Sequence, residues 1–302
     1  MEALTSATTA PTAARVWWIA ARPATLAASV APVLAGTAIA VHDGHVRALA
    51  GGAALLVAVA MQVGVNYAND YSDFVRGADS ARRVGPLRAA ASGVIPPGHV
   101  RLAAMAAFAF AAIVGLALSL ATDWRLIPVG ALCLLAGWLY TGGPRPYGYL
   151  GLGELFVFVF FGLVATVGTV YVEELRVTAL AISAGSSLGF LASAILVLNN
   201  LRDIDTDRAA GKRTLATLIG SRHTKSLLVV LVVAAFTVPI LTLILHLAAP
   251  TIMLVHFGIP LAAPAVRAAY KSADPTRLVW ALKRMALVEI AFALLMTLGL
   301  LI

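Results

Sequence analysis

The chain contains a series of long apolar stretches, and their length restricts its fold more than any other feature. A helix that crosses a bilayer needs about 20 consecutive, mostly apolar residues. The stretches are rich in Leu, Ala and Val and lack the short alternating segments of a membrane β-barrel. We therefore predict an all-α integral membrane protein with nine spans, near residues 17–41, 48–69, 99–121, 126–142, 150–172, 177–198, 224–246, 248–269 and 278–302.

The composition agrees with this class of protein. Hydrophobic residues make up 61% and charged residues 12% of the 302 positions, with a mean hydropathy of +0.92, whereas soluble domains carry about 25% charged residues. The one cysteine, Cys133, lies within an expected span. A disulfide within the chain and a thiolate metal site are therefore excluded.

The positions of the basic residues predict the orientation, since Lys and Arg favour cytoplasmic loops. With the N-terminus in the cytoplasm, 19 of the 22 basic residues fall on the inner side, and Arg47, Arg125 and Arg176 fall outside. We therefore predict nine helices with a cytoplasmic N-terminus. This distribution accounts for the formal charge of +8, so we expect no binding to nucleic acid.

The first sixteen residues lack the basic start and apolar core of a cleaved signal. We expect residues 1–16 to form a short disordered cytoplasmic tail and residues 17–302 to form a single membrane domain.

Two similar acidic motifs close apolar stretches, "NYANDYSD" at 66–73 and "NNLRDIDTD" at 199–207. Asn66 and Asn199 are 133 positions apart, as are Asp70 and Asp203, and this equal offset suggests an internal repeat. The motifs fall at the two long inner loops, expected at 70–98 and 199–223. We therefore expect the chemistry to face the cytoplasm.

The spacing within each motif places its oxygen atoms on one side of a helix, because residues three or four apart share a face. The two expected stripes are Asn66, Asp70 and Asp73, and Asn199, Asp203 and Asp207, whereas Asp205 points elsewhere and Asp79 lies in a loop. Two carboxylates about 4 Å apart repel by roughly 4 kcal/mol at an effective dielectric near 20, so a cation is expected between them. Oxygen ligands favour a hard ion such as Mg²⁺, which commonly accompanies phosphate.

Basic residues beside the motifs are suited to bind a diphosphate. Arg88 follows the first motif, and Lys212 and Arg213 follow the second. The alternative is the ordinary excess of positive charge on the inner side, which is our interpretation of Arg222, Lys225, Lys283 and Arg284. The acidic motifs also leave two alternatives open, solvated helix ends and a cation-coupled transporter, although a transporter would hold its carboxylates near the bilayer midplane.

Four segments, "NYANDYSD", "GPLRAAASG", "YTGGPRPYGYLGLGE" and "NNLRDIDTDRAAGKRTLA", resemble the UbiA-type intramembrane aromatic prenyltransferases, most of all the branch that acts on 1,4-dihydroxy-2-naphthoate in menaquinone synthesis. The likeness runs from about residue 22 to residue 220. It implies nine helices around a central cavity, Mg²⁺ and a polyprenyl diphosphate held by the two motifs, and an aromatic acceptor nearby. This chain has Gly77 where the broader family commonly has a further Asp.

The resemblance also implies a set of site residues. The expected catalytic and metal-binding residues are Asp70, Asp73, Asp203 and Asp207. The expected substrate-binding residues are Arg22, Asn66, Asn69, Arg88, Tyr140, Arg145, Tyr147, Glu154, Asn199, Lys212 and Arg213. A membrane-interface position also explains Arg22 and the tyrosines, and a helix N-terminus also explains Glu154. The run "FVFVFFG" at 156–162 is expected to line the path of the prenyl tail, and His246 and Glu289 are interpreted as structural.

The implied reaction joins a polyprenyl group to 1,4-dihydroxy-2-naphthoate, with loss of carbon dioxide and diphosphate, at the cytoplasmic side of the cell membrane. The alternatives are a related enzyme that uses 4-hydroxybenzoate or another acceptor, and the transporter.

Overall fold

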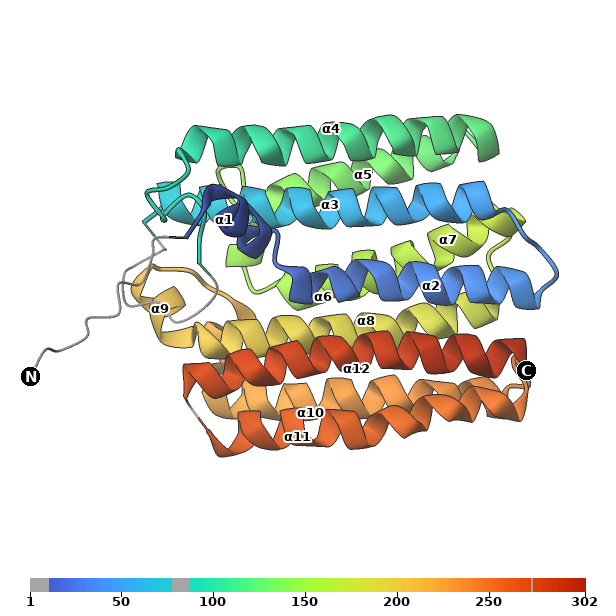
Figure 1. Cartoon of the computed structure of the whole chain (residues 1–302). Helices are drawn as coiled ribbons and strands as arrows, with labels where there is room; N and C mark the ends of the chain where they lie inside the picture. The colour runs from blue at the N-terminus through green and yellow to red at the C-terminus, as the bar shows by residue number, and fades with distance from the viewer. Residues whose placement is uncertain (1–10, 78–86, 273) are drawn as a thin grey trace, which may run out of the picture.

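The computed structural model describes residues 11–77, 87–272 and 274–302, and these form a bundle of helices (Figure 1). Asp79 lies outside the described residues. Within them, one isolated bridge between Leu150 and Arg213 is the sole β-type pairing. The prediction of an all-α fold is therefore confirmed.

The elements follow one another in the order α1 (Ala13–Ala20), η1 (Pro23–Leu26), α2 (Ala27–His42), α3 (Ala48–Val75), α4 (Pro97–Thr122), α5 (Leu126–Leu139), η2 (Tyr147–Tyr149), α6 (Gly153–Val157), η3 (Phe158–Val164), α7 (Ala165–Glu174), α8 (Ala179–Arg202), α9 (Ile204–Ala209), α10 (Leu215–Ile244), η4 (Pro250–Gly258), α11 (Ile259–Lys271) and α12 (Pro275–Leu301). Eight segments of the described chain are long and apolar enough to cross a membrane. The remaining predicted span, 126–142, corresponds to α5, which has 14 residues. The membrane character is thus confirmed, and the count of nine stays a prediction.

Several boundaries differ from the expected ones. Helix α3 continues to Val75, so both aspartates of the first motif lie inside a helix and not in the loop predicted from residue 70. Helix α10 begins at Leu215, within the loop predicted up to residue 223, and its backbone breaks at Gly220, where φ is 78°. Glycine adopts this left-handed conformation without steric cost. Helix α1 begins at Ala13, so residues 13–16, assigned to the tail, are helical.

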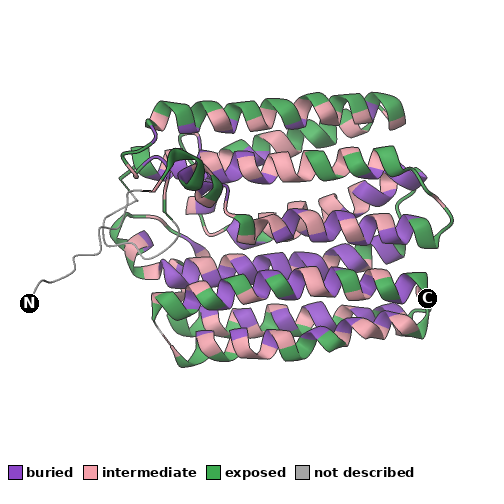
Figure 2. Ribbon diagram, viewed as in Figure 1, coloured by how far each residue is buried: buried purple, intermediate pink, exposed green. Residues whose placement is uncertain are grey.

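The buried core lies where α2, α8, α10 and α12 pack together (Figure 2). Large apolar side chains on the outer faces remain exposed, among them Leu102, Ile113, Leu120, Val230 and Leu294. In a soluble protein such surfaces would be an aggregation hazard, whereas in a bilayer they face lipid of matching polarity.

Helix α8 is closely approached by η3, which is a turn of π-helix. A Cβ atom at Gly162 in η3 would overlap the backbone of Gly189 in α8. The close approach fixes η3 against the core, and the opposite side of η3 is left to form a wall of the cavity described below.

The end of α3, the short helix α9 and α1 lie at one end of the bundle, at the left of Figure 1. The connections from α2 to α3 and from α4 to α5 lie at the opposite end. Both acidic motifs are therefore brought to the same end of the molecule, as expected. The cytoplasmic location of this end stays a prediction.

Candidate active site

A cavity of about 520 Å³ runs through the bundle between α2, α3, α4, α5, η3, α7 and α8. We refer to it as the central cavity. Asp73 and Ala54, which are 73 − 54 = 19 positions apart in α3, both line it. At 1.5 Å per residue its wall therefore extends over about 28 Å of α3. Asp73, Asp207 and Lys212 line one end, and Ser119 and Val172 belong to its far part.

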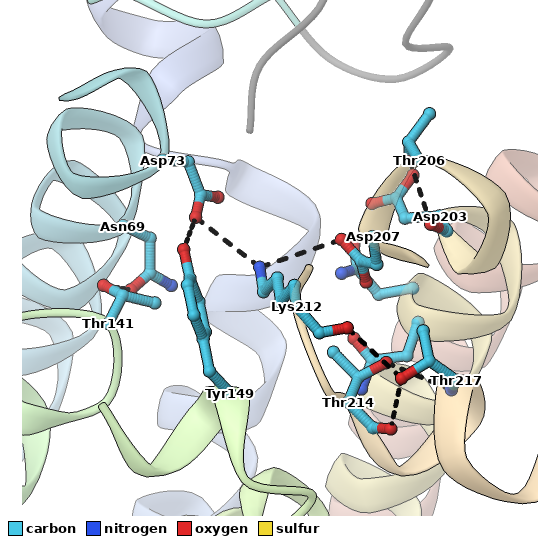
Figure 3. Close-up of polar contacts among 12 residues, drawn as sticks. Asn69, Asp73, Thr141, Tyr149, Asp203, Thr206, Asp207, Lys212, Thr214 and Thr217 are labelled. Carbon is cyan, nitrogen blue, oxygen red and sulfur yellow. Dashed lines mark hydrogen bonds and ion pairs between the residues drawn. The ribbon is translucent and has the colours of Figure 1, made fainter. Parts of the chain in front are cut away.

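Lys212 lies between the aspartates of the two motifs at the acidic end (Figure 3). Its Nζ atom is 3.5 Å from Oδ1 of Asp73 and 4.0 Å from Oδ1 of Asp207. Arg88 also donates from Nη2 to Oδ2 of Asp73, at 3.1 Å. The two carboxylates are almost fully buried, so this pair of motifs forms a site that attracts positive charge.

Tyr149, which was not predicted as a site residue, donates its hydroxyl hydrogen to Oδ1 of Asp73 at 2.7 Å. The Nζ atom of Lys212 lies 4.8 Å from the centre of the Tyr149 ring. Burial, and next the charge of Asp73, raise the pKa of the Tyr149 phenol well above its usual range. The phenol therefore stays protonated at neutral pH and acts as a hydrogen-bond donor.

Asp70 does not share the cavity face with Asp73. Its carboxylate accepts the backbone N–H groups of Ala89 at 2.8 Å and Ala90 at 3.1 Å. Of the described residues of α3, the polar ones that line the cavity are Gln62, Asn66, Asn69 and Asp73.

Helix geometry explains why the expected stripe of Asn66, Asp70 and Asp73 is wrong at its middle position. Successive residues turn by about 100°. Asp70 is therefore rotated about 40° from Asn66 in one direction, whereas Asn69 and Asp73 are rotated about 60° and 20° in the other. The ligand role of Asp70 stays a prediction.

The second motif is divided between α8 and α9. Asp203 follows the last residue of α8, and its Oδ1 accepts from Nε of Arg202 at 2.7 Å. Arg202 also donates to Oδ1 of Asn199, at 2.9 Å. Asp205 points to solvent and pairs with Arg208 at 3.6 Å, so the prediction that it points elsewhere is confirmed.

Aromatic residues form the wall beyond the acidic end. The ring of Tyr147 lies 5.5 Å from that of Tyr140 and stacks on Phe156 at 3.9 Å. These three rings line the central cavity, together with Phe160 and Phe161 of the run "FVFVFFG". The prenyl path predicted for this run therefore has a cavity beside it.

Other predicted residues have varied surroundings. Arg22 and Asn69 line the cavity, and Thr141 donates to Oδ1 of Asn69 at 2.6 Å. Glu154 is buried and accepts from Nδ2 of Asn200 at 2.9 Å, but it is not among the described residues that line the cavity.

Arg145 and Arg213 are exposed and are likewise absent from the described lining. The structure therefore does not bring these two to the cavity, and their substrate-binding roles stay predictions.

Sequence reasoning missed several polar residues near or in the cavity, among them Gln62, Thr141, Tyr149, Asn200 and Arg202. Gln62 had a usable signal, because it precedes Asn66 by four residues and so continues the same helix face. Tyr149 had none beyond its place in a motif segment, since its contact with Asp73 joins positions 76 apart.

The donor set fits a magnesium ion that is shared with a phosphate. No three His, Cys, Asp or Glu side chains of the described chain come together as a complete metal site. Mg²⁺, however, usually takes one or two carboxylates and completes its shell with phosphate oxygens and water. Asp73 and Asp207 supply two such carboxylates on opposite sides of Lys212.

The model of the UbiA prenyltransferase family matches residues 29–295 of the chain. This chain belongs to that family. A relative named 1,4-dihydroxy-2-naphthoate octaprenyltransferase, from Mycobacterium tuberculosis, is 47% identical over 232 residues, covering 77% of this chain and 78% of the relative. A Bacillus subtilis relative of the same name is 31% identical over 288 residues, covering 95% and 93%.

A solved UbiA homolog from Archaeoglobus fulgidus, bound to DMAPP and Mg²⁺, has the same fold, with a TM-score of 0.61. It is 13% identical and covers 93% of this chain and 99% of its own. The expected family and its helical architecture are therefore confirmed.

Proposed function

We propose that this UbiA family member transfers a polyprenyl group from polyprenyl diphosphate to 1,4-dihydroxy-2-naphthoate, giving the demethylated precursor of menaquinone. The proposal rests on similarity, over at least three quarters of the chain, to two relatives named 1,4-dihydroxy-2-naphthoate octaprenyltransferase. The cavity supports it, since an acidic and basic end adjoins a long apolar interior. The family match favours an enzyme over the cation-coupled transporter.

The acidic end is suited to release diphosphate. The prenyl C–O bond breaks to give an allylic cation and diphosphate, so negative charge gathers on the leaving group. Lys212 and Arg88, which contact Asp73 here, lie where they can bind that charge. A bound Mg²⁺ would act as a Lewis acid toward the diphosphate oxygens. We propose Asp70, Asp73, Asp203 and Asp207 as its carboxylate ligands, with Asn66, Asn69 and Asn199 as polar neighbours.

The apolar part of the cavity is suited to hold the chain and to exclude water from the allylic cation. Tyr140, Tyr147 and Phe156 form an aromatic wall next to the acidic end. Electron-rich faces of such rings attract cations, so these residues can stabilise the cation until the acceptor reacts.

The acceptor reacts at the ring carbon that bears the carboxylate. A new C–C bond forms between that carbon and the prenyl cation, and the electron pair of the broken ring–carboxylate bond returns to the ring as carbon dioxide leaves. No ring proton has to be removed. Among the described residues, the polar side chains that line the acidic end include no His, in keeping with a reaction that needs no strong base.

The distribution of basic residues supports a cytoplasmic site in the cell membrane. If nine spans are present, 19 of the 22 basic residues lie on the same side of the membrane as the acidic motifs. The end of α3, α9 and α1 lie together at that end of the bundle (Figure 1). Diphosphate substrates are charged and would enter from water at this end, while the prenyl tail stays in the apolar part.

The decisive experiment supplies 1,4-dihydroxy-2-naphthoate labelled at the carboxyl carbon, with a polyprenyl diphosphate and Mg²⁺, to the purified protein. Labelled carbon dioxide is expected in a one-to-one ratio with prenylated product. Label retained in the product, or prenylation of 4-hydroxybenzoate alone, would instead assign the chain to another acceptor.

A further inference from the structure

A small polar cluster lies in the wall of the central cavity, at the start of the first acidic motif. It consists of Thr25 in η1, Ser29 in α2, and Gln62 and Asn66 in α3, all of which line the cavity. Gln62 is the only glutamine in the sequence. It is 7% exposed, and Ser29 is 1% exposed.

The hydrogen bonds of this cluster fix which way each amide group faces. Nδ2 of Asn66 donates to the backbone carbonyl of Ala21 at 2.8 Å. A carbonyl can only accept, so the nitrogen of the Asn66 amide must face Ala21 and its oxygen must face Gln62. Nε2 of Gln62 accordingly donates to Oδ1 of Asn66 at 3.4 Å.

Thr25 confirms the orientation from the other side. Its hydroxyl donates to the carbonyl of Arg22 at 3.0 Å, so its oxygen is left to accept. It accepts from Nε2 of Gln62 at 3.0 Å and from Nδ2 of Asn66 at 3.1 Å. The bonds of Asn66 and of Thr25 therefore give the same orientation for Gln62. Its amide nitrogen donates within the cluster, and its carbonyl oxygen accepts no bond there.

Oε1 of Gln62 is buried and accepts no hydrogen bond from any residue that the structure describes. Oγ of Ser29, four positions after Thr25, is also buried and has no hydrogen-bond partner among the described residues. Buried polar atoms in native proteins are almost always hydrogen-bonded. Two such atoms in the wall of a cavity indicate that the molecule that fills the cavity supplies their partners.

The proposed function offers two occupants, and their chemistry differs. A polyprenyl chain carries no hydrogen-bond donor, and its diphosphate carries acceptors that belong with Lys212 and the metal. The aromatic acceptor carries two hydroxyl groups, which are donors. We propose that Oε1 of Gln62 accepts a hydrogen bond from one ring hydroxyl of the acceptor, and that Ser29 contacts the other.

This inference rests on the proposed function and specifies how the acceptor is chosen. Arg22 lines the same part of the cavity and carries the positive charge that the acceptor carboxylate needs. With the hydroxyls held at Gln62 and Ser29, the ring is oriented as well as bound. A site built to bond a substrate hydroxyl rejects an analogue that lacks it, because the protein group is then left unpaired.

The test measures binding of 1,4-dihydroxy-2-naphthoate, as KM, and of 1-hydroxy-2-naphthoate and 4-hydroxy-2-naphthoate, as inhibition constants. Each value is obtained for the wild-type protein and for Gln62→Met, which keeps the side-chain volume but removes the amide group, both the acceptor oxygen and the nitrogen that donates to Thr25 and Asn66. The variant should weaken binding of the dihydroxy acceptor by about tenfold, the usual order for one buried hydrogen bond. It should weaken binding of the analogue that lacks the Gln62-bound hydroxyl by much less.

Ser29→Ala is the second variant, because it removes one oxygen atom with little change in volume. It should reduce discrimination against the other analogue by a few-fold. Ser186→Ala is the matched control, since Ser186 is a partly exposed serine outside the described cavity lining; it should change no constant. In all variants the KM for polyprenyl diphosphate should stay at the wild-type value.

Equal weakening of all three aromatic compounds by Gln62→Met would show a merely structural residue and overturn the inference. Unchanged constants in both Gln62→Met and Ser29→Ala would overturn it as well, with water as the partner of these oxygens. Both outcomes leave the proposed function standing. A wild-type protein that fails to prenylate 1,4-dihydroxy-2-naphthoate would instead disprove the proposed function itself.

Discussion

In the first acidic motif Asp73 is held by Arg88, Tyr149 and Lys212, three residues that come from other parts of the chain. In the second motif the carboxylate of Asp203 is held by Arg202, its own neighbour in sequence. The two motifs match in sequence, yet among the described residues Asp73 is contacted by distant segments, whereas Asp203 bonds with the residue next to it.

This difference shows that the repeat in sequence does not produce a symmetric site. Lys212 follows the second motif but contacts Asp73 of the first more closely than Asp207, at 3.5 Å against 4.0 Å. Its backbone is positioned by α9, since its N–H donates to the carbonyl of Asp207 at 2.8 Å. The second motif therefore supplies a cation to the first, and the two depend on each other.

The largest effect is expected at the carboxylates that face each other. Asp73→Ala and Asp207→Ala should each lower turnover by about 100-fold or more, because one preorganised group that stabilises developing charge is typically worth about 3 kcal/mol. Asp70→Ala and Asp203→Ala should also lower it steeply if all four bind metal. Turnover is measured with saturating Mg²⁺ and both substrates.

Asp205→Ala is the internal control for this series. Its carboxylate is 91% exposed and faces away from the cavity, so turnover should stay within about twofold of wild type. If Asp70→Ala and Asp203→Ala kept full turnover while the other two variants lost it, the active carboxylates would be limited to the pair that flanks Lys212.

An intermediate effect is expected at the cation between the motifs. Lys212→Ala should raise the KM for polyprenyl diphosphate by about tenfold, since one charge-assisted contact with phosphate is lost. Arg88→Ala should act in the same direction. Lys225→Ala is the matched control, because its Nζ lies by the carbonyl of Tyr270 on an exposed surface. Equal KM values for Lys212→Ala and Lys225→Ala would favour the interpretation of Lys212 as ordinary inner-side charge.

Much of this arrangement could be predicted from sequence because it depends on local spacing. The apolar stretches predicted the all-α membrane fold, and the spacing of the two motifs identified Asp73, Asp203 and Asp207, which line the cavity. Helical spacing failed at Asp70, where a rotation of about 40° is enough to turn a side chain from the cavity to the loop of Ala89 and Ala90.

The partners of Asp73 could not be predicted, because they depend on tertiary packing. Tyr149 lies in a short 3₁₀ turn, η2, and reaches α3 only once α5 and α6 have brought that turn to the end of the bundle. Arg145 and Arg213 show the converse case. They lie in motif segments with suitable charge, yet both are exposed, since charge alone does not specify which side of a loop a residue occupies.

The smallest effect is expected at Tyr149, where hydrogen bonding and ring contact can be separated. Tyr149→Phe removes the hydroxyl that donates to Asp73 but keeps the ring 4.8 Å from Nζ of Lys212. One net hydrogen bond is worth about 1 kcal/mol, so turnover should fall by roughly fivefold. Tyr149→Ala also loses the cation–π contact and should fall further, whereas Tyr270→Phe, on an exposed surface, should change nothing. If Tyr149→Phe matched wild type, the first motif would hold Asp73 through its cations alone. The two motifs would then differ only in where their cations come from. Arg88 and Lys212 are distant from Asp73 in sequence, whereas Arg202 is next to Asp203.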